Sequence, residues 1–137
     1  MTAEVFLDTN VLLYACSGSP EDEEKRRRAS DLILNSRFGL SSQVLQEFVA
    51  NALRKPALGI SEAGIDATLE LATYVPVLPI TLELIVKATS LRRRHQLSHW
   101  DATIVAAALE PGCTTLYSED LSHGRTFNGL RVANPFI

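Results

Sequence analysis

The sequence predicts an α/β fold, a three-layer α/β/α sandwich around a parallel sheet of about five strands. Short apolar runs such as Val5–Leu7 alternate along the chain with longer segments of helical periodicity. Parallel strands joined by right-handed helical crossovers produce this alternation. The apolar run at 5–7 is also continuous, which is typical of a strand buried on both faces.

Length and composition indicate a single globular domain that covers residues 1–137. The net charge of −3 does not indicate a general nucleic-acid or membrane binder. Cys16 and Cys113 are too few for a disulfide scaffold and match no zinc spacing. The N-terminus has no basic leader, and no apolar run approaches the roughly 20 residues of a membrane span. We therefore expect a cytoplasmic protein with reduced thiols and no membrane association.

Apolar periodicity, capping residues and prolines define the expected elements in order. Ser19 and Pro20 are expected to start a helix whose acidic beginning, 21–24, pairs at i, i+4 with the basic residues 25–28. This pattern favours a solvated helix over an RNA-binding patch. The expected strands are 5–7, 38–41, an edge strand within 75–79, 114–117 and 130–133. The expected helices are 21–36, 43–54, 61–74, 81–97 and 98–109, with a short apolar helix or turn at 11–15 and a loop at 122–125.

Four acidic residues occupy positions from which a shared site could form. Asp8 and Asp120 follow strands, and ligands of open α/β sheets bind beyond the carboxyl ends of strands. Asp101 completes a capping box with Ser98, yet its spacing also places it on the buried face of its helix, and the two roles are compatible. Glu47 lies off the apolar face of helix 43–54, so spacing alone favours a solvated acid.

Four short motifs, each with one of these acids, occur in order along nearly the whole chain. They are FLDTN at 6–10, SQVLQEF at 42–48, SHWDATI at 98–104 and LYSEDL at 116–121, followed by GLRVANPF at 129–136. In these motifs the chain resembles the PIN-domain ribonucleases and, within them, the VapC-type toxins of toxin–antitoxin pairs.

The resemblance implies that the first and fourth strands are adjacent and that the acids surround a cleft. It implies that Asp8, Glu47, Asp101 and Asp120 are catalytic ligands of Mg²⁺ or Mn²⁺, with Glu119 as an alternative to Asp120. It also implies that Asn10 and Ser118 steady these ligands through hydrogen bonds.

The residue types suit this chemistry, because oxygen ligands bind hard cations that retain water. We expect hydrolysis of an RNA phosphodiester by metal-activated water, leaving 5′-phosphate and 3′-hydroxyl ends. Arg92, Arg93 and Arg125 are possible RNA contacts, although basic residues at 92–94 also suit a helix C-terminus. The resemblance further implies a small antitoxin partner and a homodimer.

Two other classes of function compete with this hypothesis. A phosphotransferase or receiver domain with a phosphorylated Asp8 fits poorly, because Asn10 stands where a dehalogenase-like pattern needs Asp and no lysine follows a late strand. A catalytically inert PIN-like module that binds RNA or protein would be expected to lose one or more acids, and all four are present. The sequence identifies neither the RNA substrate nor a toxin as opposed to a housekeeping ribonuclease.

Overall fold

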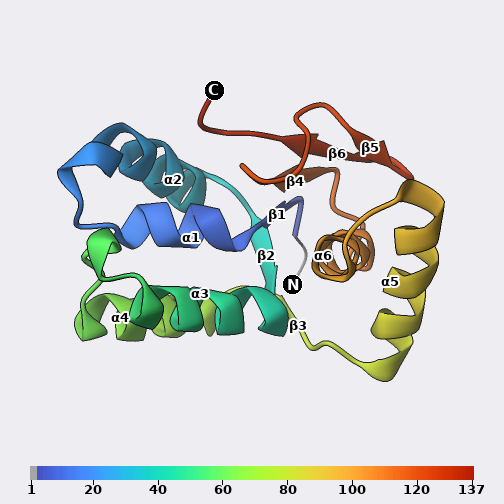
Figure 1. Cartoon of the computed structure of the whole chain (residues 1–137), viewed down its shortest axis with the longest axis horizontal. Helices are drawn as coiled ribbons and strands as arrows, with labels where there is room; N and C mark the ends of the chain where they lie inside the picture. The colour runs from blue at the N-terminus through green and yellow to red at the C-terminus, as the bar shows by residue number, and fades with distance from the viewer. Residues whose placement is uncertain (1–2) are drawn as a thin grey trace.

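A six-stranded, mostly parallel sheet forms the centre of the computed structural model, which describes residues 3–137 (Figure 1). Residues 1 and 2 of the predicted domain lie outside the described residues. The strand order is β3-β2-β1-β4-β6-β5, and only β5 runs antiparallel to its neighbour. The strands are β1 Val5–Leu7, β2 Phe38–Ser41, β3 Val77–Leu78, β4 Thr115–Tyr117, β5 Thr126–Phe127 and β6 Leu130–Ala133.

Helices cover both faces of the sheet, with α1 to α4 on one side and α5 and α6 on the other (Figure 1). This arrangement confirms the predicted three-layer α/β/α sandwich. The helices are α1 Thr9–Cys16, α2 Glu23–Asn35, α3 Ser42–Arg54, α4 Glu62–Ala72, α5 Leu82–His95 and α6 His99–Leu109, with 3₁₀ turns at Pro20–Asp22 and Pro56–Leu58. None of the helices within residues 3–137 has the length and apolar character that a membrane crossing requires.

Strand β1 lies in the middle of the sheet, between β2 and β4. Phe6 and Leu7 are fully buried, as the continuous apolar run predicted. The adjacency of β1 and β4 agrees with the family resemblance, and Leu7 pairs in register with Tyr117. The backbone N–H of Asp8 then donates to the Tyr117 carbonyl at 3.0 Å. The polar residues that follow these two strands therefore emerge side by side at one edge of the sheet.

The expectation of about five strands was one strand short. Residues 126–127 form β5, which pairs with β6 through a two-residue turn at Asn128 and Gly129. Both turn residues have positive φ, 48° and 89°, as the tight turn that suits the twist of a hairpin requires. The Asn-Gly pair was the sequence feature that could have revealed this hairpin. A two-residue strand shows no periodicity, so the apolar pattern could not reveal it.

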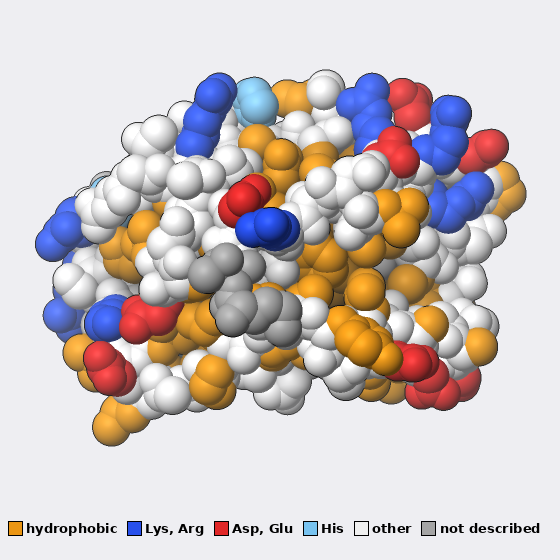
Figure 2. Space-filling view, turned by 180° about the vertical axis from the view of Figure 1, so that it is seen from behind, with side chains coloured by type: hydrophobic (Ala, Val, Ile, Leu, Met, Phe, Trp, Pro, Cys, Tyr) orange, Lys and Arg blue, Asp and Glu red, His pale blue; other side chains and the backbone are white. Residues whose placement is uncertain are grey.

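The charged helix predicted at 21–36 is also built differently at its start. A 3₁₀ turn covers Pro20–Asp22, α2 begins at Glu23, and the Ser19 side chain makes no capping hydrogen bond. Among the described residues, the only i, i+4 ion pair in this segment joins Glu24 to Arg28. Lys25 instead contacts Glu119. Figure 2 shows acidic and basic side chains interspersed over the end of the molecule formed by α2, which fits a solvated surface.

Candidate active site

Asp8 lies at the carboxyl end of β1, where its side chain caps the N-terminus of α1. Only 7% of the residue is exposed. Its Oδ1 accepts the Thr9 backbone N–H at 2.7 Å, and its Oδ2 accepts the Ser118 hydroxyl at 2.7 Å. The Asn10 side-chain amide donates a weaker bond to Oδ2 at 3.4 Å. The carboxylate is therefore buried, and donors from two neighbouring strand ends fix its orientation.

Asp120 is joined to Asp8 through the same polar residues. The Asn10 amide nitrogen donates to Asp120 Oδ2 at 3.2 Å. The Ser118 hydroxyl oxygen accepts the Asp120 backbone N–H at 3.1 Å while its proton goes to Asp8. Asn10 therefore bridges the two carboxylates, and Ser118 links the Asp8 carboxylate to the backbone of Asp120.

Glu119 faces a different set of partners from its neighbour Asp120. Its Oε1 lies 2.5 Å from Lys25 Nζ, and its Oε2 accepts the Tyr14 hydroxyl at 2.8 Å. The hydrogen bond to Glu119 is the main cause of a raised pKa at Lys25. The sequence left open which of the two acids turns toward Asp8, and this geometry favours Asp120.

Glu47 reaches the same region from α3, which begins where the Ser41 hydroxyl accepts the Val44 backbone N–H. The Thr9 hydroxyl donates to Glu47 Oε2 at 3.0 Å, and the Gln43 amide donates to Oε1 at 3.2 Å. The side chain is half-buried, in contrast to the solvated position that spacing alone favoured. Its bond to Thr9 places it beside the start of α1, next to Asp8.

The electrostatics of this cluster oppose ionisation of Asp8. The pKa of its carboxyl is raised from 3.8 to about 6, mainly by burial and to a smaller extent by the charges of Asp120 and Glu47. The hydrogen bonds from Ser118 and Thr9 lower the pKa and offset part of this effect. A buried carboxylate beside two others is costly unless a cation neutralises it. The site is therefore suited to attract a cation.

Asp101 stands apart from the other three predicted acids. It lies half-buried in the first turn of α6, where its backbone N–H donates to the Ser98 hydroxyl at 3.1 Å, which is one of the two hydrogen bonds of the predicted capping box. Within residues 3–137 its carboxylate makes no hydrogen bond or ion pair. The buried face of α6 begins with Ala102, so Asp101 sits at the margin of that face rather than inside it.

A cleft of about 290 Å³, here called the acid cleft, opens over these residues. Glu47, Asn51 and Lys55 contribute to it from one side, at helical spacing along and just beyond α3. Sequence reasoning missed Asn51 and Lys55, although their i+4 and i+8 spacing from Glu47 was visible. The acid cleft is lined by Asp8, Thr9, Asn10, Leu13, Tyr14, Glu47, Asn51, Lys55, Leu58, Glu119 and Asp120.

The donor set fits a hard divalent cation such as Mg²⁺ or Mn²⁺, because the polar groups around Asp8 are mainly carboxylate, amide and hydroxyl oxygens. Within residues 3–137, no three His, Cys, Asp or Glu side chains form a group that could hold a metal ion. The carboxylates would therefore have to draw together around an ion.

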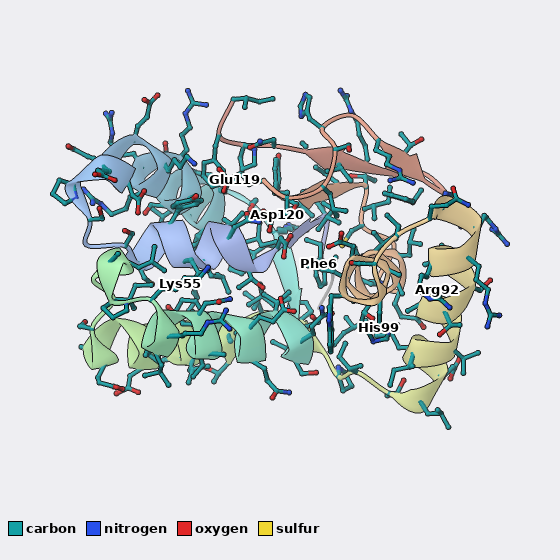
Figure 3. The ribbon with its side chains drawn as sticks, viewed as in Figure 1. Phe6, Lys55, Arg92, His99, Glu119 and Asp120 are labelled. Carbon is teal, nitrogen blue, oxygen red and sulfur yellow. The ribbon has the colours of Figure 1, made fainter. Side chains whose placement is uncertain are left out.

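The three predicted RNA-binding arginines lie outside the acid cleft. Arg92 and Arg93 lie in the last turns of α5, and Figure 3 labels Arg92 on this helix, away from Asp120 and Glu119. Arg125 donates to the His95 carbonyl at 2.5 Å and lies over the Phe127 ring, 4.9 Å from its centroid. These contacts fasten β5 to the end of α5.

The PIN domain family model matches residues 5–126, and no curated protein matches the chain. VapC20 of Mycobacterium tuberculosis, described as a sarcin-ricin loop cleaving toxin, is 24% identical, with a TM-score of 0.67 and coverage of 85% of this chain and 89% of that one. A toxin–antitoxin complex from Klebsiella pneumoniae is 18% identical, with a TM-score of 0.68 and coverage of 96% and 97%. DNA-bound VapBC from Salmonella typhimurium is 17% identical, with a TM-score of 0.68 and coverage of 97% and 98%.

At these identities the solved structures show a shared fold, and the family model matches most of the chain. Both findings confirm the resemblance seen in the four sequence motifs. This chain belongs to the PIN-domain family.

Proposed function

We propose that this protein is a metal-dependent endoribonuclease that hydrolyses RNA phosphodiester bonds and serves as the toxin of a toxin–antitoxin pair. The observation that carries the proposal is the buried Asp8 carboxylate, held by Ser118 and Asn10 next to two further acids. Membership of the PIN-domain family supports a nuclease, and the VapC-type structural neighbours support the toxin role.

Asp8, Glu47, Asp101 and Asp120 are the proposed ligands of Mg²⁺ or Mn²⁺, which would activate water and offset the charge of the phosphate. Asp8 must give up a proton before it can bind a cation, so binding should strengthen as the pH rises through about 6. Thr9 orients Glu47, while Asn10 and Ser118 orient Asp8 and Asp120. The role of Asp101 rests on the family motif, since its side chain contacts none of the other three.

Lys55 is the proposed first contact for the substrate phosphate. It is exposed, lines the acid cleft and forms no ion pair among the described residues, whereas Lys25 is already paired with Glu119. A free ammonium group beside the acids would attract an anionic strand that four carboxylates repel. Arg92, Arg93 and Arg125 remain proposed contacts for more distant parts of the RNA.

A small antitoxin and a second copy of the chain are the proposed protein partners, and the cytoplasm is the proposed location. The names of the structural neighbours support the antitoxin partner, because they describe a toxin–antitoxin complex and a DNA-bound VapBC assembly. Copurification of the chain with its co-expressed antitoxin, followed by mass measurement in solution, would test both partners.

Cleavage of total cellular RNA by the purified, partner-free protein tests the activity. Wild type should make discrete cuts with Mg²⁺ or Mn²⁺, none with EDTA, and leave 5′-phosphate and 3′-hydroxyl ends. Asp8→Asn should lose this activity, and the matched control Asp66→Asn, an exposed acid on α4, should keep it. A folded, metal-loaded protein that cuts no RNA in a broad panel would instead indicate an inert binding module.

A further inference from the structure

We propose that a groove between α3, α5 and α6 binds a nucleobase of single-stranded RNA by stacking it on Trp100. This inference rests on the proposed ribonuclease function and adds a subsite beside the acid cleft. The groove, here called the Trp100 groove, has a volume of about 890 Å³, within the usual range for small-ligand pockets. It is lined by Gln43, Gln46, Glu47, Ala50, Asn51, Arg54, Ile80, Ile85, His99, Trp100 and Thr103.

The Trp100 groove and the acid cleft are contiguous. Glu47 and Asn51 line both cavities, so the face of α3 that carries them forms the boundary between the two. In the view of Figure 3, Lys55 and His99 lie on opposite sides of Asp120. A strand whose phosphate lies over the acids could therefore place an adjacent nucleotide in the groove.

One buried amide ties the proposed platform to the acids. Gln43 Nε2 donates to Glu47 Oε1 and to the Trp100 carbonyl, both at 3.2 Å. Gln43 is 8% exposed, and its Oε1 is buried without a hydrogen-bond partner among the described residues. An unpaired buried acceptor costs stability, so folding alone would be served as well by an apolar side chain here. Gln43 is better explained as a positioning residue that fixes Trp100 relative to Glu47.

Trp100 is unusually accessible for its type. It is 64% exposed at the start of α6, and its ring meets the His99 ring edge to face at 4.8 Å between centroids. Because the ring lines the groove, it offers a ligand a flat apolar surface on which to stack. Stacking on an aromatic ring accepts every base, because each base has a π-face.

The groove favours a nucleotide over an apolar protein helix as its occupant. The exposed lining of the groove is more apolar than polar, and its aliphatic side chains are Ala50, Ile80 and Ile85. The other lining residues are mainly amides and charged or hydroxyl groups, and Arg54 supplies a cation for a phosphate. A helix-binding groove would instead need apolar contacts repeated along several turns. The chemistry therefore matches a flat base with polar edges and an anionic backbone.

Trp100 is the only tryptophan in the chain, so its fluorescence reports directly on this groove. The experiment titrates Asp8→Asn protein, which should bind without cutting, with a short single-stranded RNA and with the same RNA made abasic at one position at a time. We expect saturable quenching by the intact RNA and reduced quenching for the abasic position that faces Trp100. In the same background, Trp100→Ala should weaken binding measured by anisotropy about 5- to 100-fold, and Trp100→Phe should weaken it less.

Tyr74→Ala is the matched control, because Tyr74 is an aromatic residue of similar exposure, 69%, outside the groove. One abasic RNA should bind the parent protein more weakly than the intact RNA does. Trp100→Ala should weaken the binding of that abasic RNA little further, because the contact between the base and the ring is already lost. Additive losses would overturn stacking on Trp100 even if both changes weaken binding.

The outcomes separate this inference from the proposed function. Metal-dependent cleavage by wild type, with unchanged KM in Trp100→Ala and no quenching by RNA, would overturn the subsite and leave the nuclease intact. Quenching and weaker binding in the variants, without cleavage by wild type, would overturn the nuclease and support the subsite. Fluorescence that depends on protein concentration and not on RNA would assign the groove to contact with a second copy, and would also overturn the inference.

Discussion

The ammonium group of Lys25 lies 2.5 Å from the Glu119 carboxylate and joins α2 to the end of β4. This ion pair occupies the Glu119 carboxylate, and Asn10 donates instead to the carboxylate of Asp120. Two adjacent acids in one motif thus have different partners, which leads to a prediction that distinguishes them.

Asp120→Asn should reduce metal-dependent cleavage strongly, and Glu119→Gln should reduce it only slightly. The first removes a proposed ligand charge, whereas the second removes a charge that Lys25 already neutralises. The ion pair is partly exposed, so its loss should cost no more than about 1 kcal/mol of unfolding free energy. Cleavage rates at saturating Mg²⁺, together with urea unfolding, would check both statements. The opposite order of activities would make Glu119 the fourth ligand.

The metal-free protein should become less stable as the pH rises from about 4 to above 6. Asp8 has a pKa of about 6 when folded and 3.8 ordinarily, so the folded state binds more protons in this range. Protonation of Asp8 therefore stabilises the folded state fully below pH 3.8, and this stabilisation is lost as the pH rises through about 6. Its upper limit is about 3 kcal/mol.

Urea unfolding in EDTA at several pH values would measure this slope. Asp8→Asn should remove it, and Mg²⁺ at pH 7 should restore stability to wild type by binding the folded state. Parallel pH profiles for wild type and variant would show that Asp8 is not the group that titrates.

Ser118→Ala should shift the pH dependence of cleavage to higher pH. The hydroxyl group donates to Asp8 Oδ2 at 2.7 Å and lowers the pKa of that carboxyl, so its loss should raise the pKa further. Ser118 is fully buried, and its hydroxyl oxygen accepts the backbone N–H groups of residues 120 and 121. The substitution would leave these N–H groups without an acceptor and should lower the free energy of unfolding by about 1–3 kcal/mol. Ser122→Ala, in an exposed loop, is the control. An unchanged pH profile would leave Ser118 with a purely structural role.

Lys55→Gln should raise KM for RNA about tenfold at low salt and change kcat little. The ammonium group lines the acid cleft without an ion pair among the described residues, so its charge is free for a phosphate. The slope of log binding constant against log salt concentration should also fall by about one, as expected for the loss of one phosphate contact. Lys87→Gln is the control, because Lys87 already pairs with Glu83 and Glu110. Equal effects of the two changes would indicate a general charge effect.

The fold was largely predictable because its local patterns agree with its tertiary packing. The apolar run at 5–7 is a buried central strand, and the hydroxyl groups of Ser61 and Ser98 cap their helices. The charged segment at 21–28 was predictable as a helix, but not in its ion pairs. Lys25 forms an ion pair with Glu119, 94 residues away in the sequence, because α2 packs near the end of β4. Sequence spacing describes neighbours on one helix and says nothing of such partners.

The candidate site was predictable in its residue types but only partly in its geometry. The acid cleft brings together three acids: Asp8 and Asp120 follow adjacent strands, and Glu47 faces the start of α1 from α3. The Trp100 groove depends on how α3 lies against α6, since its residues come from separate segments. No single helix carries the pattern, so the groove was invisible before the fold was known.

Asp8 is at once a proposed ligand and the residue that caps α1, and this double role shapes how the protein can lose its activity. Asn caps a helix about as well as Asp, whereas Ala does not. In a genetic selection where unrestrained expression arrests growth, survivors that carry Asn at codon 8 should accumulate the folded protein. Survivors that carry Ala should contain little of the protein in their soluble extracts. Inactivation by a single codon change can thus preserve the surface that the antitoxin would bind, and such survivors would titrate the antitoxin away from an intact copy.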